Sequence, residues 1–338
     1  MTDIMKNILQ LAIEGPLSEK NATIAFSEIM SGNASESQIA SFLVALKCRG
    51  ENVTEIKAAA QVMLNKCEKV VAPKNCIDIV GTGGDGKGTL NISTAAALVV
   101  ASSGIPVAKH GNKNISSKSG AADVLEEMGV NTGINPNIVE TCIAEANIGF
   151  MMAPIHHPAV KNVMPARKML GVRTIFNILG PLTNPANVKY HLIGAYDKNL
   201  LEPMAFTLQQ LGSKQAWLVH GQDGIDEISI SGPTNVVQLK NSKIDMFEVC
   251  PQDAGLMPHP LSSIQGGSPT ENANELQSLL NGKLSPYRDT VLLNAAAAIV
   301  IAGKAKNLKE GVQIATQAID TGATKKTLHL LSSLTTKN

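Results

Sequence analysis

Hydrophobic residues over the first 67 positions recur at intervals of three and four, which is the spacing of one helix face. The pattern predicts four short helices, over residues 4–13, 22–30, 39–46 and 56–64. Between them lie Gly15-Pro16, Gly32-Asn33 and Gly50, each followed by a candidate N-cap, namely Ser18, Ser35 and Thr54. Such hydroxyls can accept a hydrogen bond from the first free N–H groups of a helix. We therefore expect a small helical bundle.

The pattern changes near Pro73, where short β-branched runs begin to alternate with helical stretches. Strands are predicted over residues 76–80, 105–108, 148–152, 190–195 and 216–220, and helices over 91–102, 119–128, 137–146 and 200–211. This alternation indicates a mainly parallel sheet with helical crossovers. Residues 235–249 alternate around residues 240–242, which predicts an antiparallel hairpin, and the last 65 residues are mostly helical.

Residues 158–185 are helical in pattern and interrupt the alternation of strands and helices, so we expect them to pack against the N-terminal bundle. The prediction is an α/β protein of two domains. A helical domain spans residues 1–70, joined by part of 158–188, and a larger α/β domain spans residues 71–338.

Composition excludes several classes of protein. A net charge of +1 and only 10 aromatic residues in 338 argue against a nucleic-acid binder. The longest apolar run, residues 292–302, is interrupted by Asn294 and is shorter than the roughly 20 residues that a bilayer requires. Five widely spaced cysteines form no CxxC pair, which is typical of a reduced protein. We expect a cytoplasmic protein that contacts neither membrane nor nucleic acid.

The strongest chemical signal is the glycine-rich stretch GTGGDGKGTLNIST, residues 81–94, between a predicted strand and a predicted helix. Glycines let a backbone approach a phosphate closely, and a helix N-terminus offers it free N–H groups. Two generic motifs almost match. A dinucleotide-binding GxGxxG needs an acidic residue after the second strand, but Lys109-His110 stands there. A P-loop needs Ser or Thr after Lys87, but Gly88 follows.

A second polar cluster, residues 109–129, follows the next predicted strand and so should face the first cluster. Its lysines are Lys109, Lys113 and Lys118, and asparagines and serines lie among them, which favours a second phosphate site over a merely solvated loop.

Two further features add charge. Asp226 and Glu227 are adjacent carboxylates just after a strand, and they suit Mg²⁺, which usually binds one or two carboxylates plus substrate phosphates. Arg167 and Arg173 lie in a largely apolar helical stretch, where a guanidinium is matched best by a carboxylate partner. An exposed acidic turn and structural or surface arginines are the alternatives. Together the clusters describe a substrate with separated phosphates, such as a sugar 5-phosphate 1-diphosphate.

These motifs, with HPAVKNVMPARKMLGVRTIFNILGPLTNP and HGQDGIDEIS, resemble the anthranilate phosphoribosyltransferase family in order and over nearly the whole chain. The resemblance implies a fold related to the nucleoside phosphorylases and a homodimer formed through the helical domain. It implies transfer of phosphoribose from phosphoribosyl diphosphate to the amine of anthranilate in tryptophan biosynthesis, with two Mg²⁺ ions per active site.

The resemblance also implies a role for individual residues. The diphosphate and its metal would be held by Gly81, Gly84, Asp85, Thr89, Asn91, Ile92, Ser93 and Thr94. The metal ligands would be Ser93, Asp226 and Glu227. The phosphoribosyl portion would be held by Lys109, His110, Gly111, Asn112, Lys113, Asn114, Ile115, Ser116 and Ser117, and Asn112 and Arg167 would hold anthranilate. Because an aromatic amine is already a neutral nucleophile, Lys109, Asn112 and Arg167 would act as positioning and charge-stabilising residues rather than as acids or bases.

Three positions depart from the usual family pattern. Lys113 replaces a common Arg, Asn114 replaces a small residue, and Ala121 in the phosphoribosyl site replaces a frequent Ser, removing one hydroxyl contact. Two other functions stay open: a nucleoside phosphorylase of the same fold, against which Asp226 and Glu227 argue, and a non-catalytic nucleic-acid-binding relative, against which the low net charge and Arg167 argue.

Overall fold

The structure, a computed structural model, describes residues 4–113 and 118–337. Four helices open the chain: α1 (Ile4–Glu14), α2 (Glu19–Ser31), α3 (Glu36–Arg49) and α4 (Val53–Asn65). The strands are β1 (Ile77–Gly81), β2 (Val107–Gly111), β3 (Ile148–Met152), β4 (Tyr190–Gly194), β5 (Gln215–Gly221), β6 (Thr234–Lys240) and β7 (Lys243–Val249). The remaining helices are α5 (Ile92–Ser102), α6 (Ala121–Glu127), α7 (Pro136–Ala146), α8 (Ala153–His156), α9 (Met164–Leu170), α10 (Phe176–Leu182), α11 (Leu201–Gln210), α12 (Pro269–Leu280), α13 (Pro286–Ile301), α14 (Leu308–Asp320) and α15 (Ala323–Thr336), with short 3₁₀ turns at Pro158–Asn162, Lys198–Leu200, Pro251–Ala254 and Leu261–Ile264.

Among the described residues, seven strands form one sheet in the order β3-β2-β1-β4-β5-β6-β7. The first five are parallel, and β6 and β7 form the antiparallel hairpin predicted from alternation, with Asn241 and Ser242 at positive φ in its turn. Strand order reverses between β1 and β4, which pair with Gly81 opposite Gly194. Ligands of open α/β sheets bind at the carboxyl ends of strands at such a reversal. The fold therefore directs attention to the ends of β1 and β4.

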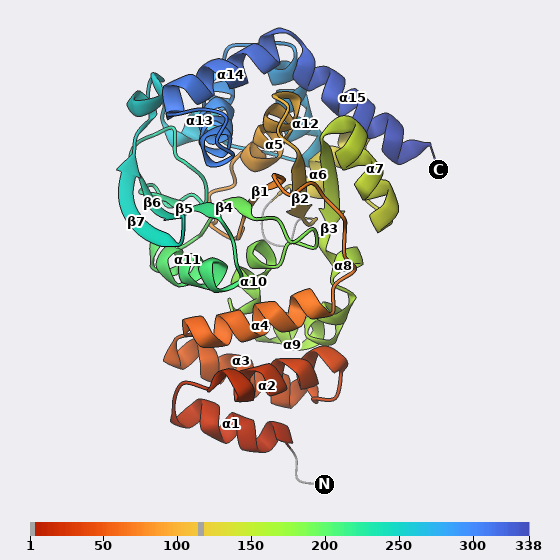
Figure 1. Ribbon diagram of the computed structural model, residues 1–338, viewed down its shortest axis with the longest axis vertical. Coiled ribbons are helices and arrows are strands. Elements are labelled where there is room, and N and C mark those ends of the chain that lie inside the picture. The colour runs from red at the N-terminus through yellow and green to blue at the C-terminus, as the bar shows by residue number, and fades with distance from the viewer. Residues whose placement is uncertain (1–3, 114–117, 338) are drawn as a thin grey trace.

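Each face of the sheet contributes to a separate apolar core. One core contains residues of β1–β3 together with helices α5, α7, α13 and α14, which lie above the sheet in Figure 1. The other core joins the opposite face of β4–β6 to α11, α10 and the bundle α1–α4, which lies below the sheet. Within β5 the two cores alternate, with Trp217 in the first and Leu218 in the second. The bundle and this face of the sheet thus share the second core.

The bundle helices begin where capping residues allow. Ser18 and Ser35 accept backbone N–H groups of Asn21 and Gln38, as predicted. The prediction of Thr54 as a cap was wrong: Asn52 caps α4 and forms a reciprocal capping box with Glu55, while Thr54 lies inside the helix.

The segment from 158 to 182 lies against the bundle. Phe176 of α10 packs on Phe26 of α2 with ring centroids 6.3 Å apart in an edge-on arrangement, and Asn162 donates from Nδ2 to the carbonyl of Met30 at 3.0 Å. Among residues 4–113 and 118–337, no helix has the length and apolar character needed to span a bilayer.

Candidate functional site

The glycine-rich loop leaves the end of β1 and enters α5. The φ angles of Gly83, Gly84, Gly86 and Gly88 are all positive, between 63° and 74°. Residues other than glycine seldom adopt this backbone conformation. The loop is fixed at both ends by backbone bonds, because the N–H of Thr82 donates to Gly194 and the carbonyl of Gly88 accepts from Gly266. The glycine content therefore serves a specific backbone path at the edge of the sheet.

Asp226 lies directly over the paired ends of β1 and β4. A Cβ at Gly194 would stand 1.5 Å from the carbonyl oxygen of Asp226, and a Cβ at Gly81 would stand 2.4 Å from its Oδ2. Both glycines are therefore required by space rather than by torsion angle. Gly81 belongs to the predicted site, but Gly194 does not. Its only sequence signal is a glycine at the end of a predicted strand.

The two acidic residues contact opposite sides of the loop. Asp226 Oδ2 accepts from the N–H of Gly83 at 2.7 Å, and Glu227 Oε1 accepts from the N–H of Ser93 at 3.1 Å, in the first turn of α5. Burial and the carboxylate of Asp85 raise the pKa of Asp226 to about 7, and burial and Asp226 raise the pKa of Glu227 to about 8. The structure thus brings the predicted metal ligands Ser93, Asp226 and Glu227 together.

Lys109 provides the buried cation of the site. Its ammonium donates to the carbonyl of Ile79 at 2.6 Å and to Ser93 Oγ at 3.2 Å. Burial lowers the pKa of Lys109, while Asp78 and Glu227 oppose that shift. Sequence reasoning missed Asp78, because a single carboxylate inside a predicted strand carries no local signal of the distant partner that packing brings to it.

Asp78 joins two strands to the segment before β4. It accepts from Asn184 Nδ2 at 2.7 Å and from the N–H of His110 at 3.2 Å, and Asn184 also donates to the carbonyl of Ala108 at 2.9 Å. Burial raises the pKa of Asp78 to about 6, although its hydrogen bonds and Lys109 oppose the shift.

The second cluster, where described, lies beside the first. Asn91 links them, since its Oδ1 is 3.4 Å from Ser119 Oγ and its Nδ2 is 3.4 Å from the carbonyl of Ser119. Asn112 Oδ1 accepts from the N–H of Lys113 at 2.8 Å, and the ammonium of Lys113 pairs with Glu126 of α6 at 2.9 Å. The predicted positions Asn114, Ile115, Ser116 and Ser117 lie outside the described residues.

The remaining positions at this end are close-packed. A Cβ at Gly111 would be 2.7 Å from the Phe150 ring and 3.3 Å from Ala121 Cβ, so Ala121 lies at the end of β2. His110 is buried and its Nδ1 is 3.0 Å from the carbonyl of Gly180, while its Nε2 has no hydrogen-bond partner among the described groups.

Not every residue of the first motif offers its side chain to a ligand. Ile92 lies in the apolar core, and its N–H already donates to Leu90. Thr89 forms a backbone bridge with Gln265. Thr94 is buried, and its Oγ1 has no hydrogen-bond partner among the described residues.

The two arginines differ in their surroundings. Arg167 of α9 stands over the ring of Phe176 at 5.7 Å, and burial lowers its pKa. Within residues 4–113 and 118–337, it forms no ion pair with a carboxylate. Arg173 is exposed, stacks 4.1 Å over the ring of Tyr196 and donates to the carbonyl of Gly84. Arg173 therefore braces the glycine-rich loop.

The oxygen donors fit a divalent cation that also binds a substrate. No group of three His, Cys, Asp or Glu side chains in the described part of the chain is arranged to hold a metal alone. Burial, together with repulsion from neighbouring carboxylates, raises the pKa values of Asp226 and Glu227, and a cation between them would favour their charged forms. Carboxylate and hydroxyl oxygens with phosphates completing the shell are typical of Mg²⁺.

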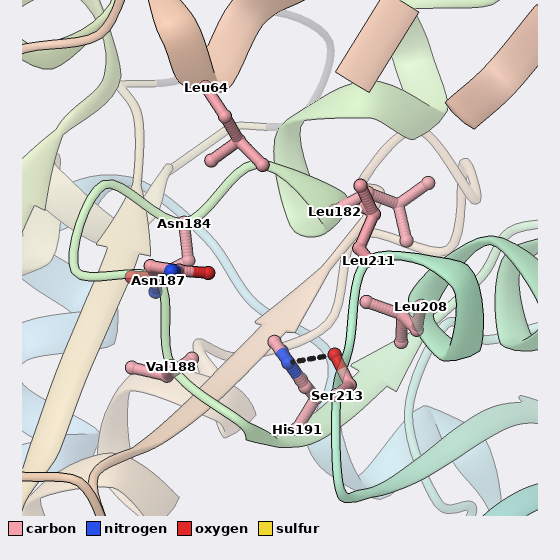
Figure 2. A pocket seen from close by; sticks show the side chains of 9 residues that line it. All are labelled: Leu64, Leu182, Asn184, Asn187, Val188, His191, Leu208, Leu211 and Ser213. Carbon is pink, nitrogen blue, oxygen red and sulfur yellow. Dashed lines mark hydrogen bonds between the residues drawn. The ribbon is translucent and has the colours of Figure 1, made fainter. Parts of the chain in front are cut away.

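A separate cavity lies at the amino ends of β4 and β5 (Figure 2), and none of Ser93, Asp226 and Glu227 lines it. Its volume of about 10 Å³ is room for one water molecule. Figure 2 shows His191 directed at Ser213, with His191 Nε2 3.0 Å from Ser213 Oγ. The cavity is too small for a substrate.

Comparison with known proteins identifies the family. Residues 3–67 match the helical bundle domain of a glycosyl transferase family, and residues 73–325 match the a/b domain of such a family. Anthranilate phosphoribosyltransferase of Bradyrhizobium sp. strain BTAi1 is 52% identical over 333 residues, covering 98% of this chain and 99% of that protein. The chain belongs to the anthranilate phosphoribosyltransferase family. The resemblance and the fold class expected from the sequence are confirmed.

Solved structures of anthranilate phosphoribosyltransferases share this fold. The enzyme from Thermus thermophilus is 40% identical and has a TM-score of 0.92 over 98% of this chain and 99% of that one. The enzyme from Saccharomyces cerevisiae, in complex with PRPP and Mg, is 31% identical with a TM-score of 0.88 over 95% and 94% of the two chains.

Proposed function

We propose that the protein transfers phosphoribose from phosphoribosyl diphosphate to the amine of anthranilate, releasing diphosphate, in tryptophan biosynthesis. The observation that carries the proposal is the convergence of Gly83, Ser93, Asp226 and Glu227 over the ends of β1 and β4. The relatives named for this activity support it.

The diphosphate end of the site depends on Mg²⁺ in this proposal. Ser93, Asp226 and Glu227 would hold the ion together with phosphate oxygens, two ions being engaged per site. When bound, Mg²⁺ would neutralise charge that develops on the departing diphosphate. The loop glycines Gly81 and Gly84, together with Asp85 and Thr89, would position the diphosphate, and the N-terminus of α5 would add its free N–H groups.

The acceptor end depends on positioning. We assign Arg167 and Asn112 to anthranilate and Lys109 to the phosphoribosyl portion. Because the aromatic amine is neutral and nucleophilic at pH 7, the site needs no strong general base. Holding the amine in line with the ribose carbon supplies the main rate advantage.

The test is loss of anthranilate fluorescence on addition of phosphoribosyl diphosphate, with and without Mg²⁺. We expect Mg²⁺-dependent loss in the wild type. Asp226→Asn combined with Glu227→Gln should raise the Mg²⁺ concentration needed for half-maximal rate. Glu145→Gln, which removes an exposed carboxylate of α7 and leaves the acidic pair intact, is the matched control. No fluorescence loss in folded wild-type protein would overturn the function, and an unchanged Mg²⁺ titration in the double variant would remove both residues as ligands.

We further propose that the protein forms a homodimer through the helical domain and works in the cytoplasm. Exposed apolar side chains of α1 and α3 support the dimer, namely Ile4, Leu11, Ile13 and Val44. All five cysteines are free thiols, as suits a reducing compartment. Sedimentation of the wild type and of Leu11→Glu tests the interface: a dimer that the substitution converts to monomer supports it, and equal masses overturn it.

A further inference from the structure

Helix α13 is apolar and buried along nearly its whole length, with Asn294 fully buried in the middle of it. The side chain of Asn294 forms hydrogen bonds with both the N–H and the carbonyl of Ile228. Its Oδ1 accepts from the N–H of Ile228 at 3.0 Å, and its Nδ2 donates to the carbonyl of Ile228 at 3.0 Å. Nδ2 also donates to the carbonyl of Thr290, so both ends of the amide are used.

Ile228 follows Glu227 directly, so these two hydrogen bonds fix the main chain beside the acidic pair. The same helix also holds the other side of the site. Tyr287, two turns before Asn294, donates from its hydroxyl to the carbonyl of Asn91 at 3.2 Å. Asn91 precedes α5, whose Ser93 N–H donates to Glu227. A closed ring of contacts therefore runs through α13, the acidic pair and the start of α5.

We propose that Asn294 is a positioning residue that sets the orientation of Asp226 and Glu227 for a divalent cation. The inference rests on the proposed function of these carboxylates. A buried asparagine is costly unless its amide is fully bonded, and an apolar residue would serve the core as well. What an apolar residue cannot do is hold the backbone of Ile228. Groups that orient ligands in this way contribute to metal affinity without touching the metal.

The test is binding of Mn²⁺, used as a paramagnetic probe, in the presence of phosphoribosyl diphosphate and without anthranilate, so that no turnover occurs. We expect Asn294→Leu to weaken Mn²⁺ binding about tenfold, measured by electron paramagnetic resonance of the free ion. Asn294→Ser leaves room for a water molecule to reach Ile228, and its loss should be smaller. Asp226→Asn serves as the positive control.

Two variants of the same helix are the matched controls for lost stability. Thr290→Val removes a buried hydrogen bond to the carbonyl of Pro286, and Ile299→Val removes a buried methylene, yet neither side chain bonds to residues 226–228. Both should keep wild-type Mn²⁺ affinity. If Asn294→Leu and Asn294→Ser lower the melting temperature but bind Mn²⁺ as the controls do, the inference is wrong. A wild type that takes up no Mn²⁺ would overturn the metal part of the proposed function, and this inference with it.

Discussion

The two charged ends of the site are built in different ways. At the sheet edge, the carboxylates of Asp226 and Glu227 are held by backbone N–H groups of the loop and of α5. On α9, the guanidinium of Arg167 rests on the Phe176 ring and forms no ion pair with a carboxylate of the described residues. The proposed diphosphate end is thus assembled by the main chain, whereas the proposed acceptor end presents a cation without a carboxylate partner in the described part of the chain.

The two ends are therefore sensitive to different changes. A main-chain site is sensitive to small changes of backbone position, since a displacement of about 1 Å can cost a hundredfold in rate. A side-chain site is sensitive to loss of one group and tolerates shifts around it.

The largest effect is expected for Gly194→Ala. The new Cβ would stand 1.5 Å from the carbonyl oxygen of Asp226, which belongs to the backbone and cannot rotate away. We expect kcat/KM to fall about 100-fold or more, measured by anthranilate fluorescence. Gly81→Ala should do less harm, because its closest contact is the side-chain carboxylate of Asp226, which can rotate at the cost of its bond to Gly83. Gly232→Ala, with open space around it, is the control. Equal activity of all three variants would contradict a site built by the main chain.

Gly194 also shows what sequence reasoning cannot reach. Its clash partner, Asp226, lies far along the chain, and nothing local to either residue reveals that the two meet. Asn294 and Ile228 are separated even further. By contrast, the glycine-rich loop and the acidic pair were found because each carries its chemistry in a few consecutive residues.

The secondary structure follows the same division between local and distant causes. The strand at 148–152 was predicted with the bounds that the structure gives. The error at α4 was one of interpretation, because Asn52 with Glu55 three residues later is a capping-box sequence that was available. The hydrogen bond between Asp78 and Asn184 could not be predicted, because the two residues are far apart in the chain and only packing brings them together.

The second largest effect concerns the acceptor end. We expect Arg167→Ala to raise the KM for anthranilate about 30-fold, the equivalent of about 2 kcal/mol, because the carboxylate of bound anthranilate would lose its charged partner. The KM for phosphoribosyl diphosphate should stay nearly constant. Lys168→Ala, at the neighbouring position, is the control for general loss of charge. Equal rises in both KM values would show that Arg167 is not specific to the acceptor.

A smaller effect is expected for the arginine that contacts the glycine-rich loop. Arg173 joins Tyr196 to the carbonyl of Gly84, so Arg173→Ala should loosen the glycine-rich loop. We expect the KM for phosphoribosyl diphosphate to rise about fivefold, in line with the loss of one hydrogen bond of about 1 kcal/mol. Tyr196→Leu should reproduce part of the rise in steady-state assays. A change confined to anthranilate would instead assign Arg173 to the acceptor end.

The last effect is on stability rather than on activity, and it comes from two buried, neutral histidines. His110 and His157 are buried with ring centroids 5.1 Å apart. Burial lowers the pKa of His110 to about 3 and that of His157 to about 4, from 6.5. A histidine with a depressed pKa in the folded state stabilises the fold fully above pH 6.5 and loses that contribution as pH falls toward the folded value. Between about pH 7.5 and 5.5, each should therefore lower the free energy of unfolding by about 1.4 kcal/mol.

Replacing one histidine isolates its share of this pH dependence. Asp78 opposes the trend, because its pKa is raised and its protonation stabilises the fold at low pH. The difference between wild type and His157→Gln removes that background. We would measure the free energy of unfolding in urea by Trp217 fluorescence. Between about pH 7.5 and 5.5, it should fall by about 1.4 kcal/mol less in His157→Gln than in the wild type. If the free energy of unfolding falls equally in the two proteins, burial does not lower the pKa of His157.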